Sequence, residues 1–468
     1  MTPSLRAKNR RSLPLLVVDR PLIIGIYLRP EPGKQLRIGT LLRDDSGVVT
    51  FLVDEGYIAL GPERPLVSMA WYGTDEADSV SRLRARGDKI MQGGYLPAFF
   101  QNMLPEGILR DIVAKEFVHG AFDQADVLAF LGGDLPGAIV AQLEAGKPAR
   151  RAPPEEQKDQ GVDGAVADVR FSLAGQQMKF SAISDRKSIT VPAMGKEGEL
   201  ILKTPSDNPK FRYLPEIEYA SMQLADAAGV RTAECWLVES SSVSGIAEPF
   251  LKGGDYALAV KRFDRAPGGI RIQIEDFAQI FGALPDAKYS TGNEATILNA
   301  TRRFCTDSRG ELLEAVRRFI VAVLVGDGDR HLKNTSLMLG SRDGLPEVSL
   351  TPAYDVVSTY LLHNDQRMAM KLGGTDDPWR YDVAKLERAA GLLKVEPKVI
   401  IREAKRTVER ARDLWPKQLQ ELPIPTERKR KLVDRIEKLP LANELSPKPV
   451  KGVEFPEDEA EPVAAPKP

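Results

Sequence analysis

The sequence feature that most constrains the fold is an apolar segment that runs directly into a polar loop, at residues 319–334. Residues 319–325 are all hydrophobic, as expected for the buried end of a helix. The loop that follows carries four side chains able to do chemistry: Asp327, Asp329, Lys333 and Asn334. A buried helix is therefore expected to deliver these polar residues to one place.

A third aspartate is expected to return to this loop. Two short apolar segments, 336–339 and 347–350, flank a Ser-Arg-Asp-Gly turn and predict a β-hairpin. Asp355 follows the hairpin, twenty-one residues after Asn334. Because a hairpin reverses the chain, it would bring Asp355 back beside Asn334.

The spacing of these residues is typical of phosphoryl transfer. That reaction needs a carboxylate to orient the attacking hydroxyl, and oxygen ligands to hold Mg²⁺ against the β- and γ-phosphates. In the protein-kinase signature a base aspartate precedes a metal-binding asparagine by five residues, and a later aspartate also binds metal. Asp329 and Asn334 have this separation. Asp327 does not, so we interpret it as a loop-shaping or helper carboxylate.

Two simpler interpretations compete with this one. An Asp-Gly-Asp segment is commonly a solvated turn, and paired aspartates also occur in calcium loops. An EF-hand loop counted from Asp327 requires glycine at its sixth position, where this sequence has Leu332. The calcium loop is therefore excluded, and the solvated turn remains an alternative.

Composition excludes several classes of protein. The chain has 468 residues, which predicts two or three domains, and its net charge of −1 argues against a protein that wraps nucleic acid by itself. Cys235 and Cys305 are too few for a disulfide framework or a metal-binding set, and three histidines are too few for a zinc site. These counts indicate a reducing cytoplasm. No apolar run approaches the roughly twenty residues of a membrane span.

The first third of the chain is expected to hold no chemistry. Residues 1–20 are interpreted as a flexible basic arm, because their apolar run is too short for a signal peptide and is broken by Pro14. Residues 21–150 predict a small N-terminal domain of mixed α and β structure. Its expected elements are strands at 22–28, 39–42, 48–53 and 138–142, a helical pattern at 99–112, and a turn at 132–137.

Residues 151–168 are rich in Pro, Gly and charged side chains and are interpreted as a linker or mobile loop. Residues 169–265 then predict a nucleotide-binding lobe. Two strands are expected around a turn at Gly175, where Ser172 and Lys179 could cover phosphates, although a plain hairpin fits the pattern equally well.

The rest of this lobe follows the order of elements found in kinases. A strand at 199–203 ends in Lys203, and the helix at 215–229 carries Glu218 in its first turns. The strand at 256–264 runs into a polar exit suited to a hinge that grips adenine. A lone strand-end lysine is often only a solvated edge charge, so this order carries more weight than any single element.

Residues 266–440 predict a helical catalytic lobe, with helical periodicity most regular from 376 onward, and residues 441–468 predict a disordered tail. The expected fold class is therefore α+β. It consists of a small N-terminal α/β subdomain and a two-lobed, protein-kinase-like body with a mostly helical C-terminal part.

The chain resembles the HipA-like serine/threonine kinases, the toxin components of bacterial toxin–antitoxin pairs. The resemblance covers about residues 20–415. Its segments are 102–107, 132–138, 171–179, 201–203, 216–219, 260–264, 275–279, 328–334, 350–355 and 368–374. One departure is Lys261, at a position where an acidic residue can occur.

The resemblance implies a role for each candidate residue. Asp329 would be the catalytic base, and Asn334 and Asp355 the Mg²⁺ ligands. The residues expected to bind ATP are Ser172, Gly175, Lys179, Lys203, Lys261, Phe263, Asp264 and Lys333. Ser172 would also be autophosphorylated, which would expel the phosphate-covering loop and silence the kinase.

The resemblance further implies a growth-inhibiting toxin in the cytoplasm that uses ATP and Mg²⁺. Its partner would be a helix-turn-helix, HipB-like antitoxin through which it meets DNA indirectly, and its substrate a translation protein such as an aminoacyl-tRNA synthetase. No membrane contact is expected. Two rivals remain: a small-molecule kinase for antibiotics or sugars, and a catalytically silent binding protein. The intact set of Lys203, Asp329, Asn334 and Asp355 argues against the second.

Overall fold

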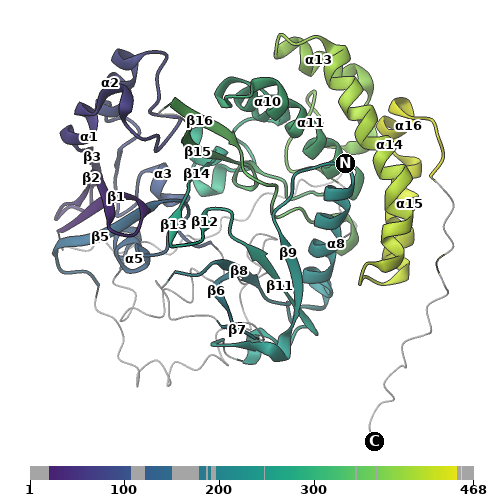
Figure 1. The fold of residues 1–468 in the computed structure, drawn as a ribbon, viewed down its shortest axis with the longest axis horizontal. Coiled ribbons are helices and arrows are strands. Elements are labelled where there is room, and N and C mark those ends of the chain that lie inside the picture. The colour runs from purple at the N-terminus through teal and green to yellow at the C-terminus, as the bar shows by residue number, and fades with distance from the viewer. Residues whose placement is uncertain are drawn as a thin grey trace, which may run out of the picture.

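The structure is a computed structural model that describes residues 21–106, 122–149, 179–185, 188–190, 197–246, 248–342, 345–363, 367–450 and 455. The described chain has an α+β fold in three successive parts (Figure 1). A small sheet domain comes first, a β-rich lobe second and a helical lobe last. The phosphate-covering segment with Ser172 and Gly175 lies outside the described residues.

The N-terminal domain is built on a five-stranded antiparallel sheet with strand order β4-β3-β2-β1-β5. Its strands are β1 (Leu22–Glu31), β2 (Lys34–Arg43), β3 (Val49–Val53), β4 (Ile90–Met91) and β5 (Ile139–Gly146). Its helices are α1 (Glu55–Ala59), α2 (Glu76–Arg84), α3 (Ala98–Gln101) and α5 (Gln124–Leu131). Residues of β1 alternate between buried and more exposed positions, so one face of the sheet forms a core. The predicted strands of this domain are confirmed.

The second part is a six-stranded sheet with strand order β10-β7-β6-β8-β11-β9. Its strands are β6 (Lys179–Asp185), β7 (Ser188–Thr190), β8 (Leu200–Lys203), β9 (Cys235–Glu239), β10 (Val243–Ser244) and β11 (Tyr256–Lys261). Helix α8 (Leu214–Ala227) packs against β9 and β11. Pro215 lies in the first turn of α8 and Gly229 follows its end with a positive φ, which confirms the predicted limits of this helix.

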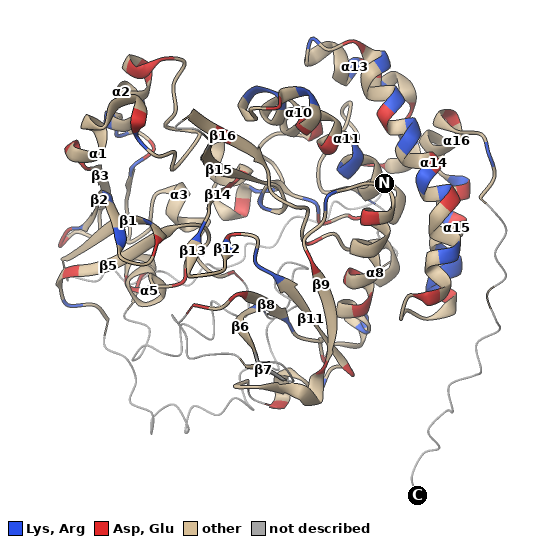
Figure 2. Cartoon of the chain, viewed as in Figure 1, with Lys and Arg blue, Asp and Glu red and all other residues tan. Residues whose placement is uncertain are grey.

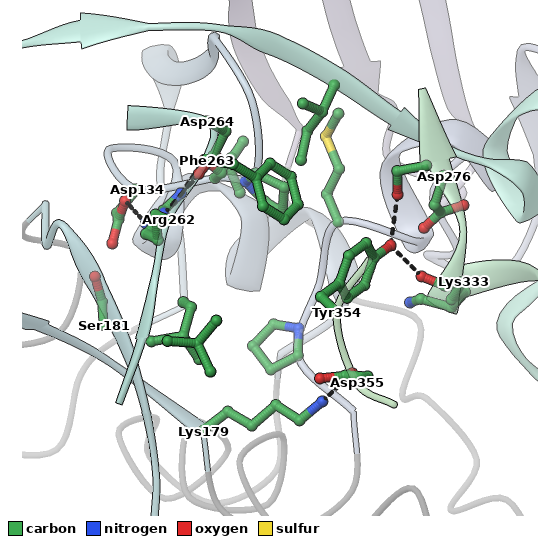
Figure 3. A pocket seen from close by; sticks show the side chains of 18 of the residues that line it. Asp134, Lys179, Ser181, Arg262, Phe263, Asp264, Asp276, Lys333, Tyr354 and Asp355 are labelled. Carbon is green, nitrogen blue, oxygen red and sulfur yellow. Dashed lines mark hydrogen bonds and ion pairs between the residues drawn. The ribbon is translucent and has the colours of Figure 1, made fainter. Parts of the chain in front are cut away.

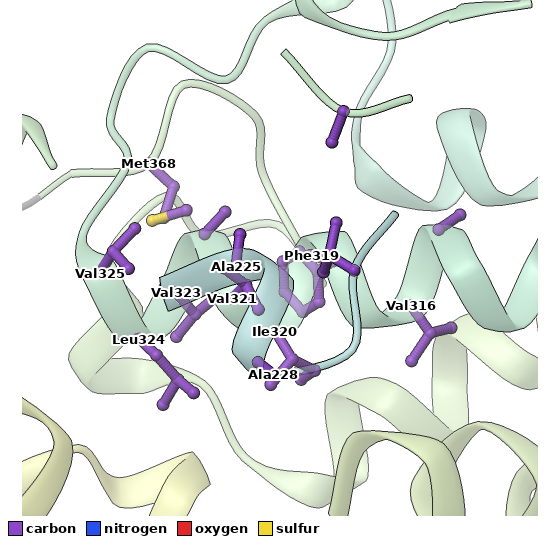
Figure 4. Close-up of a cluster of buried hydrophobic side chains, with 14 of the residues drawn as sticks. Ala225, Ala228, Val316, Phe319, Ile320, Val321, Val323, Leu324, Val325 and Met368 are labelled. Carbon is purple, nitrogen blue, oxygen red and sulfur yellow. The ribbon is translucent and has the colours of Figure 1, made fainter. Parts of the chain in front are cut away.

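The helical lobe is organised around α11 (Ser308–Val325), whose last turns are buried on every side. Phe319, Ile320 and Leu324 project from it into a core shared with Ala225 and Ala228, from the end of α8 (Figure 4). The surrounding helices are α9 (Phe277–Ile280), α10 (Glu294–Phe304), α12 (Thr359–Leu362), α13 (Val383–Leu392), α14 (Pro397–Glu421) and α15 (Thr426–Lys438). Both signs of charge alternate along α14 and α15 (Figure 2).

A three-stranded sheet, β14 (Gln273–Asp276), β15 (Ser336–Arg342) and β16 (Leu345–Leu350), joins this lobe to the others. Strands β15 and β16 form the predicted hairpin, in which Leu337 pairs with Leu350. A two-stranded ribbon of β12 (Arg265–Ala266) and β13 (Ile270–Arg271) follows the hinge. Among the described residues, none of the helices has the length and apolar character needed to cross a bilayer.

The prediction that disorder begins at residue 441 is wrong for residues 441–450. Pro440 opens a further helix, α16 (Pro440–Leu445), and Leu441, Leu445 and Val450 are buried in the main core. The backbone after the helix is held by Arg412, whose guanidinium donates to the carbonyls of Ser446 and Lys448. The average composition of the tail concealed this short apolar face.

A buried carboxyl fastens the N-terminal domain to the body. Glu275 on β14 lies 2.5 Å from Ser68 Oγ and accepts a hydrogen bond from the backbone N–H of Met69 at 2.7 Å. Burial raises the pKa of Glu275 from 4.5 to about 8, because these two hydrogen bonds do not replace its lost hydration. The group is therefore protonated at neutral pH.

This buried proton predicts a pH-dependent stability. Between about pH 4.5 and pH 8 the folded protein binds a proton that the unfolded chain releases, so rising pH favours unfolding in this window. Glu275→Gln keeps the hydrogen-bond pattern of the neutral acid but cannot titrate, so it should remove this pH dependence of the stability. We expect the urea midpoint of the wild type to fall relative to that of Glu275→Gln between about pH 5 and pH 8.5. Glu55→Gln, at an exposed glutamate, controls for the lost charge; parallel curves for wild type and Glu275→Gln would contradict the expectation.

Candidate active site

The polar loop begins where α11 is forced to stop. Gly326 adopts the left-handed conformation, with φ of 74°, and a Cβ at this position would lie 2.6 Å from Cβ of Tyr360. The backbone N–H groups of Gly326 and Asp327 both donate to the carbonyl of Ala322, which caps the helix. The chain therefore turns sharply away from the core at the position that the apolar run predicted.

Hydrogen bonds within the loop fix the positions of its polar residues. The carboxylate of Asp327 accepts from the backbone N–H of Asp329 at 3.1 Å, and Asn334 Nδ2 donates to the backbone carbonyl of Asp329 at 2.9 Å. Burial and the nearby Asp329 raise the pKa of Asp327 well above its ordinary value. Asp327 is thus placed to shape the loop. Asp329 and Asn334, five residues apart in the sequence, are in direct contact.

The carboxylate of Asp329 has a partner that the sequence did not indicate. Tyr289 Oη donates to Asp329 Oδ1 at 2.6 Å. Burial raises the pKa of Asp329, and this hydrogen bond opposes the rise. Tyr289 precedes Asp329 by forty residues and belongs to no recognisable motif.

The hairpin returns the chain to the loop as predicted. Tyr354 Oη donates to the backbone carbonyl of Lys333 at 2.6 Å and lies 2.5 Å from Ser336 Oγ (Figure 3). These contacts hold Asp355, the next residue, close to Asn334, and both residues line one small cavity. The third aspartate and the asparagine are therefore brought together.

Two lysines converge on Asp355. Lys179 Nζ donates to Asp355 Oδ2 at 2.6 Å (Figure 3), and Lys203 Nζ contacts both Asp355 Oδ1 and Glu218. Burial alone would lower the pKa of Lys203, but the two carboxylates hold it above its ordinary value. Burial alone would likewise raise the pKa of Asp355, and the lysines hold it well below its usual range. The predicted pair of Lys203 and Glu218 is confirmed.

A cavity of about 430 Å³ opens beside these charges, which is within the size range of small-ligand pockets. Among the residues that line it are Lys179, Lys203, Lys261, Phe263, Asp264, Lys333 and Asp355. Asn334 lies in the smaller cavity, which shares Tyr354 and Asp355 with the first. Most of the side chains expected to bind ATP thus surround one space, between the six-stranded sheet, the hinge and the hairpin.

Beyond the cluster around Asp355, three more of these side chains have protein partners. Lys261 is largely exposed and lies 2.9 Å from Glu234, so only its backbone belongs to the hinge. Lys333 lies 2.6 Å from Glu106 and donates to the backbone carbonyl of Asn102. Asp264 is buried against Arg262 and Arg265. Their geometry indicates that they shape the cavity wall.

The N-terminal domain supplies the opposite wall, which sequence reasoning missed. The turn at residues 132–137, expected to hold no chemistry, places Asp134 2.7 Å from Arg262 (Figure 3). Asp134 also lies 3.0 Å from Arg265. The backbone N–H of Gly137 also donates to Asp264 at 2.8 Å. Further lining residues from this domain are Asn102, Met103, Leu104, Pro105, Leu131, Leu135 and Pro136. The first domain is therefore part of the pocket.

The donor set suits a divalent cation bound with a polyphosphate. Mg²⁺ in such sites takes one or two carboxylate or amide oxygens from protein and fills its other positions with phosphate and water. Asp355 and Asn334 can supply two such oxygens, and Lys179 and Lys203 can meet the phosphate charge. Within the described residues, this site included, no group of three or more His, Cys, Asp or Glu side chains is arranged to hold a metal by itself.

Comparisons with known proteins agree with this architecture. Residues 33–142 match the model of the HipA N-terminal domain, and residues 171–415 match that of the HipA-like C-terminal domain. Y4dM of Sinorhizobium fredii, named as a candidate kinase, is 33% identical over 406 residues, covering 86% of this chain and 93% of that protein. Y4mE of the same organism, also named as a candidate kinase, is 29% identical over 300 residues, covering 59% and 67%.

A solved structure has the same fold. One chain of the Shewanella oneidensis toxin–antitoxin complex of HipA, HipB and operator DNA superposes with a TM-score of 0.64. The two chains are 19% identical, and the match covers 91% of this chain and 100% of that one. At this identity the likeness concerns the fold.

Proposed function

Because the chain belongs to the HipA-like family, we propose that it is an ATP- and Mg²⁺-dependent protein kinase that phosphorylates serine or threonine. The observation that carries the proposal is the convergence at Asp355. The strand lysine Lys203 contacts Asp355 and is held by the helix carboxylate Glu218, and the loop residue Asn334 lines one small cavity with Asp355. The names of the two curated relatives support the same class of reaction.

The proposed division of labour follows from the contacts. Lys203, held by Glu218, and Lys179 would bind the phosphates, while Asn334 and Asp355 would hold the metal ion. Bound Mg²⁺ would neutralise charge on the β- and γ-phosphates. Asp329 would accept a hydrogen bond from the acceptor hydroxyl and orient that oxygen toward the γ-phosphorus.

The hinge offers one backbone position for adenine. The N–H groups of Lys261 and Arg262 already donate to the carbonyls of Glu234 and Glu199. Phe263 is the next hinge residue, and its ring lies 5.5 Å from that of Tyr354. We therefore place the adenine contact at the backbone of Phe263, between the apolar side chains of Ile201 and Ile274, which line the same cavity.

A protein substrate is favoured over a small molecule by the surroundings of the base. Glu106, an acidic residue close to the pocket, is already neutralised by Lys288 at 2.5 Å and Lys333 at 2.6 Å. Few free carboxylates remain among the described pocket residues to attract a polycationic antibiotic. The acceptor is therefore proposed to be a hydroxyl of a cytoplasmic protein.

Incubation of the purified protein with labelled ATP and a cytosolic extract tests this proposal. We expect at least one labelled protein band, and no stimulation of ATP turnover by aminoglycosides or sugars. Turnover that depends on a small molecule, without any labelled protein, would support the small-molecule kinase instead. The absence of both turnover and nucleotide binding would support the catalytically silent binding protein.

The proposal extends to a toxin held by an antitoxin. The structurally similar Shewanella chain belongs to a complex with HipB and operator DNA. We propose a helix-turn-helix, HipB-like partner for this chain, through which it would reach DNA, and a translation protein such as an aminoacyl-tRNA synthetase as its target. The net charge of −1 is consistent with indirect DNA contact.

Ser172 is proposed as the autophosphorylation site. A phosphoserine carries about −1.5 to −2 charges at neutral pH, so placing it beside the phosphates of ATP is unfavourable. We expect Ser172 to gain phosphate during incubation with ATP, and activity to fall as it does, while Ser172→Ala stays active for longer. Mass spectrometry follows the phosphate on Ser172, and an activity assay over the same time course follows the loss of turnover. Stable phosphate only at other sites would contradict the assignment.

A further inference from the structure

The contact between Tyr289 and Asp329 joins two loops of the helical lobe. Tyr289 lies just before α10, and its ring meets the ring of His331 edge-on, with centroids 4.9 Å apart. Lys288 Nζ lies 5.6 Å from the centre of the Tyr289 ring. The hydroxyl then reaches Asp329 Oδ1 at 2.6 Å. The ring is therefore anchored independently of the hydroxyl.

Among the residues that the structure describes, Tyr289 is the one hydrogen-bond partner of the Asp329 side chain. The backbone of Asp329 is held by Asp327 and Asn334, but those contacts involve its N–H and carbonyl groups. A carboxylate turns readily about its last bond, because that torsion has broad, roughly two-fold minima. A donor on Oδ1 restricts this rotation and leaves Oδ2 to accept from another hydroxyl.

The charges around the phenol keep it a donor. Burial, Asp329, Glu106 and Asp327 all raise the pKa of Tyr289 above its ordinary value. The hydroxyl therefore stays protonated throughout the physiological range. The neighbouring His331 stays neutral, because burial and Lys288 lower its pKa to about 3.

We propose that Tyr289 is a positioning residue for the catalytic base: its hydroxyl fixes one oxygen of Asp329 so that the other faces the acceptor hydroxyl. This inference rests on the proposed function, since it assigns Asp329 as the base. Tyr289 itself exchanges no proton and touches no phosphate. It would raise the fraction of molecules in which the base is correctly oriented.

The competing interpretation is that Tyr289 blocks the base. Its hydroxyl donates to Asp329 in the same way as an acceptor hydroxyl would, so it could occupy the acceptor's place. The two interpretations predict opposite effects of removing the hydroxyl. A positioning hydroxyl increases turnover, whereas a blocking hydroxyl decreases it.

Tyr289→Phe in the full-length protein separates them, because the ring contact with His331 remains. We expect kcat to fall about 10- to 100-fold, the loss that corresponds to one hydrogen bond to a charged group. The dissociation constant for Mg-ATP should stay within about twofold of wild type, because Tyr289 contacts no proposed nucleotide ligand. In an Asp329→Asn background the second substitution should cause little additional loss.

Tyr27→Phe is the matched control, because it removes a phenol that donates to Glu144 on the sheet of the N-terminal domain. It should leave kcat unchanged. A Tyr289→Phe enzyme with wild-type or higher kcat would overturn the inference while leaving the proposed kinase function intact. If Tyr289→Phe lowered kcat by the same factor in the Asp329→Asn background as in the wild type, the inference would also be overturned. A wild-type protein that neither transfers phosphate nor hydrolyses ATP would overturn both proposals.

Discussion

Asp329→Asn is expected to lower turnover by about 10²- to 10⁴-fold while nucleotide affinity stays close to that of the wild type. The amide keeps the shape of the side chain and can still accept from Tyr289 Oη, so the loop should keep its structure. It cannot take up the proton of the acceptor hydroxyl. The loss should therefore appear in kcat, measured by transfer from labelled ATP, and not in the dissociation constant measured by calorimetry.

Asp327→Asn is the matched control for this change. Asparagine keeps the shape of the Asp327 side chain, and its amide oxygen can still accept from the N–H of Asp329. Turnover of Asp327→Asn should remain within a few-fold of the wild type. If Asp327→Asn abolished turnover and Asp329→Asn did not, the assignment of the base would be wrong.

Asp355→Asn is expected to weaken Mg²⁺-dependent nucleotide binding at least tenfold. Substituting a residue that only supports a metal ligand typically costs about 10- to 100-fold, and a direct ligand should matter at least as much. The substitution removes a negative charge from the proposed metal site and leaves Lys179 without this partner. Lys203 keeps its contact with Glu218, so the lobe should still fold. Unlike Asp329→Asn, this variant should lose both affinity and turnover.

Calorimetric titration of ADP with and without Mg²⁺ measures this effect. In the wild type Mg²⁺ should tighten binding, and in Asp355→Asn most of that difference should disappear. Asp434→Asn, at an exposed ion pair on α15, controls for the loss of one carboxylate. A variant at residue 355 that retains the full Mg²⁺ effect would exclude Asp355 as a ligand.

Local patterns were sufficient to predict the central part of the site. The apolar run of α11, the glycine that ends it and the hairpin of β15 and β16 are each specified by adjacent residues. Together they determine that Asp355 returns to Asn334. The pairing of Lys203 with Glu218 was predictable for a related reason, since a strand end and the first turns of the next helix lie close together.

The remaining parts of the site depend on packing between distant segments. Tyr289 meets Asp329 only because α10 and α11 pack together, and Asp134 meets Arg262 only because the first domain docks on the hinge. Neither the hydrophobic periodicity of the sequence nor the spacing of its motifs predicts such contacts. The buried start of the supposed tail, at Leu441 and Leu445, was missed because residues 441–468 taken together are rich in proline and charged side chains.

We propose above all that this site transfers the γ-phosphoryl group of ATP to a protein. The most direct test supplies the wild type and Asp329→Asn with a cytosolic extract and with ATP labelled in either the γ- or the α-phosphate. We expect protein to acquire label from γ-labelled ATP alone, on serine or threonine, and only with the wild type. Label from α-labelled ATP, or equal labelling by Asp329→Asn, would contradict it.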